Sequence, residues 1–165
     1  MMKTRIGVIG ADGAITPAVS RISEKIGADI AKAGAVLICG GRGGVMEAVS
    51  RGASLAGGLV VGILPSYDWK EGNAYIDIAI TTGMGHSRNS IVVSSSDALI
   101  AINGRPGTLS EISLALCMEK PVISVLGTGG VAEVIEEELK KMGIKEKVLS
   151  AKPAEAVKKA LRSIK

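Results

Sequence analysis

The segment AVLICGGRGGVMEAVSRGA, residues 35–53, joins an apolar run to a glycine cluster and then to an amphipathic pattern. The run at 35–39 is apolar at every position, which is typical of a strand buried on both faces of a parallel sheet. From residue 45 onward the apolar residues recur at helical spacing. The segment therefore predicts a strand, a glycine turn and a helix, which is the repeating unit of an α/β protein.

The same alternation of strand and helix runs through the rest of the chain. Further strands are predicted at 5–10, 59–64, 97–102 and 121–126, with a weaker sixth at 148–151. Helices are predicted at 16–34, 45–56, 87–95, 108–118, 131–143 and 153–165. The first of these helices has Thr16 as its N-cap and Pro17 in its first turn. This order predicts a three-layer, Rossmann-like α/β fold with a doubly wound, mostly parallel sheet, in one domain that covers residues 1–165.

Composition narrows the classes of function. No apolar run is long enough to span a membrane, and the N-terminal segment lacks the pattern of a secretory signal, so we expect a cytoplasmic protein that does not bind membranes. Cys39 and Cys117 lie far apart and outside any metal-ligand motif, so we expect reduced thiols and no metal. The net charge of +4 is scattered and aromatic residues make up only 2%, which argues against nucleic acid as a partner.

In a doubly wound sheet, ligands bind beyond the carboxyl ends of the strands. The loop 40–44 has four glycines in five positions between a buried strand and a helix, and Gly10 begins a similar loop after the first strand. Glycines let a ligand approach the backbone, and the first turn of the helix offers unpaired N–H groups to an anion. The loop therefore predicts a phosphate cradle; a tight turn without a ligand is the alternative. Its spacing matches neither the dinucleotide fingerprint nor the P-loop.

The loop NGRPGTLSE, residues 103–111, repeats this design after another strand. Thr108 and Glu111 have the spacing of a capping box, in which the threonine caps the helix and the glutamate returns to its amide. A carboxylate in the first turn of a helix has a lowered pKa, so we expect Glu111 to be ionised. An ionised carboxylate can also bind sugar hydroxyls or stabilise an oxocarbenium-like charge, so a role in capping and a role in ligand binding both remain open.

A third loop, GMGHSRN, places His86 and Arg88 at the start of a predicted helix. A lone histidine is more often structural or exposed than catalytic, whereas a guanidinium suits bidentate binding of phosphate. In the predicted fold Arg42, Arg88 and Arg105 converge on one rim, which predicts an anionic ligand. The predicted ligand-binding residues are Gly10, Gly40, Gly41, Arg42, Gly43, Gly44, His86, Arg88, Gly104, Arg105, Gly107, Thr108 and Glu111.

Together, GGRGGVMEAVSRGA, GMGHSRN and GRPGTLSEI resemble motifs of the LONELY GUY family, also labelled lysine-decarboxylase-like, and most closely its short relatives similar to the molybdenum cofactor carrier protein. The resemblance implies a Rossmann-like fold and a homodimer or homotetramer with sites near subunit contacts. It also implies recognition of a nucleotide monophosphate. In active members, the residues matching Arg88 and Glu111 support hydrolysis of the N-glycosidic bond, which releases free base and ribose 5-phosphate without a catalytic cofactor.

Two departures from the hydrolase signature change the expected function. Asn103 replaces its proline, which we expect to be a mild change, and Arg105 replaces its second glycine, which puts a long cation where backbone should approach the ligand. We therefore expect binding of a phosphorylated nucleotide or of a pterin such as the molybdenum cofactor, with phosphoribohydrolase activity as the alternative. Lysine decarboxylation is rejected because no lysine in the ligand loops could carry pyridoxal phosphate. The loop 65–75 either stacks on a ligand ring or is a surface excursion.

Overall fold

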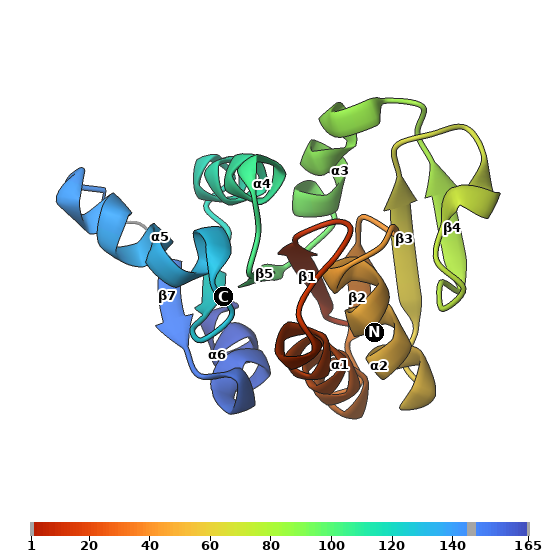
Figure 1. Ribbon diagram of the computed structural model, residues 1–165, viewed down its shortest axis with the longest axis horizontal. Coiled ribbons are helices and arrows are strands. Elements are labelled where there is room, and N and C mark those ends of the chain that lie inside the picture. The colour runs from red at the N-terminus through yellow and green to blue at the C-terminus, as the bar shows by residue number, and fades with distance from the viewer. Residues whose placement is uncertain (1, 145–147, 165) are drawn as a thin grey trace.

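The computed structural model describes residues 2–144 and 148–164. Seven parallel strands form one sheet in the order β4-β3-β2-β1-β5-β6-β7 (Figure 1). The strands are β1 Arg5–Gly10, β2 Val36–Cys39, β3 Val60–Leu64, β4 Ile78–Thr81, β5 Ala98–Ile102, β6 Val122–Val125 and β7 Val148–Ala151. The order reverses between β1 and β5, so a ligand site is expected beyond the carboxyl ends of these two neighbouring strands.

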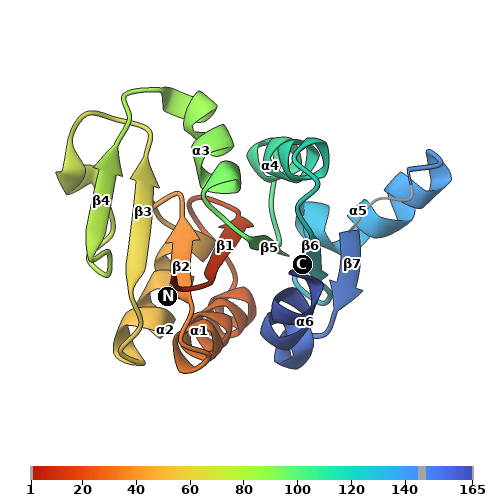
Figure 2. The same ribbon diagram turned by 180° about the vertical axis from the view of Figure 1, so that it is seen from behind.

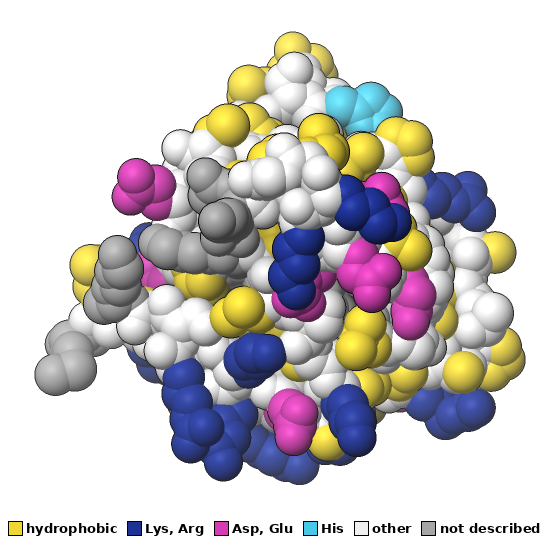
Figure 3. Space-filling view, turned by 90° about the vertical axis from the view of Figure 1, so that its left-hand side faces the viewer, with side chains coloured by type: hydrophobic (Ala, Val, Ile, Leu, Met, Phe, Trp, Pro, Cys, Tyr) yellow, Lys and Arg dark blue, Asp and Glu magenta, His cyan; other side chains and the backbone are white. Residues whose placement is uncertain are grey.

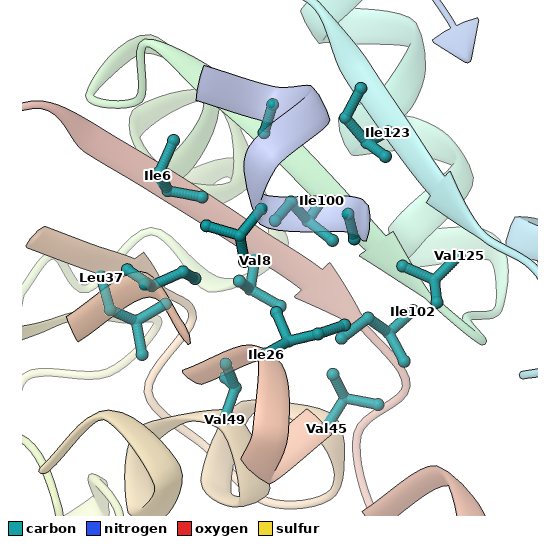
Figure 4. Packing of buried hydrophobic residues seen from close by; sticks show 14 of the residues in the cluster. Ile6, Val8, Ile26, Leu37, Val45, Val49, Ile100, Ile102, Ile123 and Val125 are labelled. Carbon is teal, nitrogen blue, oxygen red and sulfur yellow. The ribbon is translucent and has the colours of Figure 1, made fainter. Parts of the chain in front are cut away.

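Helices cover both faces of the sheet, as Figures 1 and 2 show from opposite sides. The α-helices are α1 Pro17–Lys32, α2 Val45–Leu55, α3 Asn89–Ser94, α4 Pro106–Cys117, α5 Gly130–Lys141 and α6 Ala156–Ser163. Short 3-10 helices are η1 Trp69–Glu71, η2 Gly85–Arg88 and η3 Pro153–Glu155. One core cluster joins the sheet to α1, α2 and α6 (Figure 4), and the other joins it to α3, α4 and α5. The predicted three-layer α/β fold is confirmed.

Helix α1 illustrates how local sequence sets these boundaries. The hydroxyl of Thr16 accepts a hydrogen bond from Val19 N at 3.2 Å, and Pro17 occupies the first turn, as predicted. Past the C-cap, Gly34 has a φ of 72°, a conformation that favours glycine and ends the helix. Of the predicted last helix, 153–165, the structure forms η3 and α6, and residue 165 lies outside the described residues.

Strand β4 was not predicted. Its four residues, Ile78–Thr81, are all exposed, and it forms an edge of the sheet that pairs only with β3. Ile78 and Ile80 are 47% and 44% exposed, and the short helix η1 lies beside this strand. The predicted helix at 87–95 is divided into η2 and α3. Among the described residues, no helix combines the length and the apolar character needed to cross a membrane.

Candidate functional site

A cavity of about 560 Å³ lies beyond the carboxyl ends of β1 and β2, where α3 and α4 begin. Its volume is typical of a small-molecule site. We call this cavity the arginine pocket, and its lining residues are Val8, Ile9, Gly10, Ala11, Asp12, Gly40, Arg42, Met46, Pro65, Gly85, His86, Arg88, Asn89, Arg105, Gly107, Thr108 and Glu111. The structure thus brings residues from all four loops that follow the strands, 10–16, 40–44, 81–89 and 103–108, to one place.

The three predicted arginines, Arg42, Arg88 and Arg105, all line the arginine pocket, whereas only two carboxylates, Asp12 and Glu111, do so. The lining therefore favours an anion. The predicted residues that do not line it are Gly41, Gly43, Gly44 and Gly104. Figure 3, which views the side formed by α5, β7 and α6, shows the chain's one histidine at the upper end and a group of lysines and arginines at the lower end.

Arg88 and Glu111 form a buried pair at the base of the pocket. Their side chains are 10% and 9% exposed, and Arg88 Nη1 lies 3.8 Å from Glu111 Oε1. Arg88 Nη2 donates to Gly40 O at 3.3 Å, and Nη1 donates to Asn89 Oδ1. Arg88 Nε has no hydrogen-bond partner among the described residues. A buried donor without a partner is costly, so an acceptor from a ligand would be stabilised here.

Burial dominates the protonation of this pair. It raises the pKa of Glu111 to about 7, and the charge of Arg88 opposes the shift only in part. Burial also lowers the pKa of Arg88, while Glu111 acts in the opposite direction. The carboxyl group of Glu111 therefore titrates near neutral pH.

The predicted capping box is wrong. Helix α4 begins at Pro106, with Arg105 as the N-cap residue and no side-chain capping hydrogen bond. Thr108 is therefore inside the helix, and Glu111 lies in the second turn, where the effect of the helix dipole has already weakened. The expected low pKa of Glu111 is also wrong, because burial raises the pKa more than the helix dipole lowers it. Proline is favoured at the first helical position, and this preference competed with the capping pattern.

The glycine cluster before α2 serves packing as well as the pocket. A Cβ atom on Gly40 would lie 2.5 Å from Arg88 Nη2, so the absence of a side chain makes room for the guanidinium. Gly44 has a φ of 60°, and a Cβ atom there would lie 2.3 Å from Ala11 O. These two glycines are required by the protein itself, whether or not a ligand approaches.

Arg42 joins three segments at the rim of the pocket. Its Nε lies 3.4 Å from Asp12 Oδ2, and its Nη1 lies 3.7 Å from Glu71 Oε2. Asp12 Oδ1 also accepts from Gly43 N at 3.2 Å. Asn73 Nδ2 donates to Arg42 O at 3.0 Å. The loop 65–75 therefore contacts the site through Glu71 and Asn73.

The aromatic residues of that loop lie elsewhere. Tyr67 and Trp69 line a separate hollow of about 750 Å³ along β4, and neither lines the arginine pocket. They are 85% and 65% exposed. Stacking of these rings on a ligand in the arginine pocket is therefore not favoured by their positions.

Two features of the site were missed in the sequence. Asn89 lines the pocket and donates to Ser110 Oγ at 3.1 Å; it follows Arg88 directly, but asparagine is also common at helix starts. The second is the loop 126–130, whose Thr128 hydroxyl accepts from Asn103 N at 2.9 Å. Its three glycines in LGTGG were the available signal.

Asn103 is not the mild replacement that was expected. Its φ is 56°, whereas proline is restricted to a φ near −65°. The backbone at this position therefore cannot accept the proline of the signature, while asparagine tolerates the left-handed region.

Neither cysteine is in a disulfide: Cys39 is buried and Cys117 is exposed. Within residues 2–144 and 148–164, no group of three or more His, Cys, Asp or Glu side chains is placed to hold a metal ion.

The family model of the SLOG cluster4 family matches residues 3–157. An uncharacterized protein of Archaeoglobus fulgidus is 51% identical over 127 residues, which are 76% of this chain and 82% of that protein. The molybdenum cofactor binding protein of the phototrophic bacterium Rippkaea orientalis superposes with a TM-score of 0.87 at 38% identity, over 98% of each chain. The molybdenum cofactor carrier protein of Chlamydomonas reinhardtii gives a TM-score of 0.82 at 34% identity, over 98% of this chain and 99% of that one.

Proposed function

Because this chain belongs to the SLOG cluster4 family, we propose that it binds a phosphorylated small molecule, a nucleotide or a pterin-type cofactor, in the arginine pocket. The observation that carries the proposal is the meeting of Arg42, Arg88 and Arg105 in one cavity of about 560 Å³. Guanidinium groups bind phosphate through paired, charge-assisted hydrogen bonds. The first turn of α4, whose Gly107 and Thr108 line the pocket, adds N–H groups that have no acceptor within their own helix.

The molybdenum cofactor is our leading candidate ligand. The support is the 38% and 34% identity to a molybdenum cofactor binding protein and a molybdenum cofactor carrier protein over nearly the whole chain. The residues fit a phosphate-bearing pterin, because the pocket has surplus arginine and the Nε of Arg88 lacks a partner among the described residues. In this function the protein holds its ligand and performs no chemistry on it.

Isothermal titration calorimetry with AMP, GMP and molybdenum cofactor tests the proposal. We expect binding of at least one of these ligands and a loss of about tenfold or more in affinity on replacing Arg105 with glycine, because a charged hydrogen bond is lost. Arg21→Ala is the matched control, since Arg21 is an exposed arginine of α1 that does not line the pocket. The absence of binding for all three ligands would contradict the proposal.

A second candidate function is hydrolysis of a nucleoside 5′-monophosphate to free base and ribose 5-phosphate. It is favoured by Glu111, whose buried carboxyl group faces the same pocket as Arg88 and has a pKa raised to about 7. In this role both residues engage the ribose, and the ionised carboxylate of Glu111 stabilises its developing positive charge while water attacks. Chromatography of AMP incubated with the protein decides between the two functions. Free adenine that disappears in Glu111→Gln would establish the hydrolase, whereas intact AMP with measurable binding would establish the binder.

We also propose that the chain self-associates as a homodimer or homotetramer. The support is the apolar corner at β4, where Ile78 and Ile80 are about half exposed on the edge strand. Open edges and exposed apolar surface favour association. Light scattering after size exclusion should give a multiple of the 16.8 kDa chain mass, and Ile80→Lys should shift the protein toward the monomer. A wild-type protein that is monomeric at high concentration would contradict this.

A further inference from the structure

The loop between β5 and α4 brings two backbone carbonyl groups close to an anion site. Carbonyl oxygens carry partial negative charge, so those of Asn103 and Gly104 would repel a phosphate if they faced the arginine pocket. Instead, Asn103 O accepts from Ala132 N at 2.9 Å and Gly104 O accepts from Val131 N at 3.1 Å. Both donors belong to the first turn of α5, and neither Asn103 nor Gly104 lines the pocket.

Thr128 fixes this arrangement from the other side. Its hydroxyl accepts from Asn103 N at 2.9 Å and donates to Val125 O at 2.7 Å, while its own carbonyl accepts from Asn103 Nδ2 at 2.6 Å. Thr128 is 4% exposed, so these hydrogen bonds are shielded from water. Asn103 Oδ1 accepts from Gly104 N at 2.7 Å, which supports the left-handed conformation of Asn103.

The start of α5 also lies close to the loop between β5 and α4. A Cβ atom on Gly130 would lie 2.5 Å from Gly104 O, so the start of α5 touches the backbone of the loop directly. The next residue of that loop is Arg105, whose side chain lines the arginine pocket. The path of the chain at 103–104 therefore sets where the Arg105 side chain begins.

We propose that Thr128 and Asn103 are positioning residues: with the first turn of α5, they turn two carbonyl groups away from the arginine pocket and hold Arg105 at its rim. This inference rests on the proposed function. Neither residue lines the arginine pocket, so neither touches the ligand. Their effect on binding passes through Arg105 and through the exclusion of negative charge from the pocket.

The test is the affinity for AMP, measured by calorimetry, in Thr128→Val, Thr128→Ser and Asn103→Gly. Valine keeps the shape of threonine but removes the hydroxyl, so we expect a loss of about tenfold, while serine restores affinity to within about twofold of wild type. Asn103→Gly keeps the positive φ but removes the side-chain hydrogen bonds, and it provides an independent variant if Thr128→Val does not fold. Ser124→Ala is the matched control, because it removes a buried β6 hydroxyl that pairs with Ser150 Oγ at 3.1 Å.

A double-mutant cycle separates positioning from general destabilisation. In an Arg105→Ala background the loss caused by Thr128→Val should shrink below about threefold, because part of its effect passes through the deleted side chain. An unchanged loss in that background, or wild-type affinity in both Thr128→Val and Asn103→Gly, would overturn the inference. A wild-type protein that binds neither AMP, GMP nor molybdenum cofactor would overturn the proposed function and this inference with it.

Discussion

The two glycine loops of the arginine pocket, 40–44 and 103–108, look alike in sequence but carry their arginines differently. Arg42 is ion-paired with Asp12 and Glu71, so its charge is shared with two carboxylates before any ligand binds. Arg105 forms no ion pair with another described residue, and its loop is held by neutral groups of the loop 126–130 and α5. A similar motif can therefore supply either a neutralised or a free cation, depending on what lies behind the loop.

The largest expected effect concerns the glycines of the two loops. Gly44→Ala should lower the free energy of unfolding by about 3 kcal/mol or more, because its φ is 60° and the new Cβ would lie 2.3 Å from Ala11 O. Gly107→Ala, at the start of α4, has no atom within 4 Å of the new Cβ and should change stability by less than about 1 kcal/mol. Urea denaturation of both variants measures the difference. Equal losses would show that the two loops have the same packing requirement.

The second prediction compares the carboxylates of the two helices that follow these loops. Glu111 in α4 is buried with a pKa of about 7, above its ordinary value of 4.5, so the folded state holds the proton more tightly than the unfolded state. Its contribution to stability is full below about pH 4.5 and is lost as the pH rises through 7. Between pH 5 and pH 8 the wild type should lose roughly 2–3 kcal/mol relative to Glu111→Gln.

Denaturant unfolding at several pH values checks this prediction. Glu47→Gln is the control, because Glu47 is an exposed carboxylate in the first turn of α2 and its replacement should change stability by less than about 0.5 kcal/mol. Parallel pH profiles for wild type and Glu111→Gln would show that Glu111 does not titrate in this range.

The third prediction concerns the arginines themselves. Arg105→Gly should weaken anion binding about tenfold, and Arg42→Gly only about threefold, because Arg42 already shares its charge. Calorimetric titrations with AMP at one fixed salt concentration give the two ratios. A larger loss of affinity for Arg42→Gly than for Arg105→Gly would show that Arg42, and not Arg105, is the arginine whose charge is free for the ligand.

The smallest effect should come from Glu71. Glu71→Gln removes one of the two carboxylates beside Arg42, so affinity for an anion should rise by about two- to threefold, while stability changes by less than about 1 kcal/mol. The gain should disappear in an Arg42→Gly background. Unchanged affinity would mean that the contact between Arg42 and Glu71 does not compete with the ligand.

Much of the fold followed from the sequence because parallel strands buried on both faces are apolar at every position, as in 35–39 and 98–102. Strand β4 was not predicted because it is a short edge strand. All four of its residues are exposed, so its sequence lacks the pattern of a strand buried on both faces. The convergence of Arg42, Arg88 and Arg105 was predictable from the rule that ligand loops follow the strands. The protonation of Glu111 was not, because burial is a property of the packed structure and the local capping pattern pointed the other way.

The other features that the sequence did not predict are contacts between segments that lie far apart in the chain. No local rule links Thr128 to Asn103, since this contact depends on β5 and β6 lying side by side. Likewise, the ion pairs of Arg42 with Asp12 and Glu71 require three loops to meet. Such contacts decide how strongly each arginine acts, although the arginines themselves can be recognised in the sequence.

The space left by Gly40 links two positions that are 48 residues apart. Because the guanidinium of Arg88 occupies the place where a side chain at 40 would begin, the two positions should change together during divergence. A descendant that replaced Arg88 with a short residue could acquire alanine or serine at 40 once the flexible side chain of Met46, whose Sδ would lie 2.7 Å from the new Cβ, also shifted. A descendant that keeps the arginine is bound to keep the glycine, so glycine at 40 paired with arginine at 88 should mark the relatives that retain this cation.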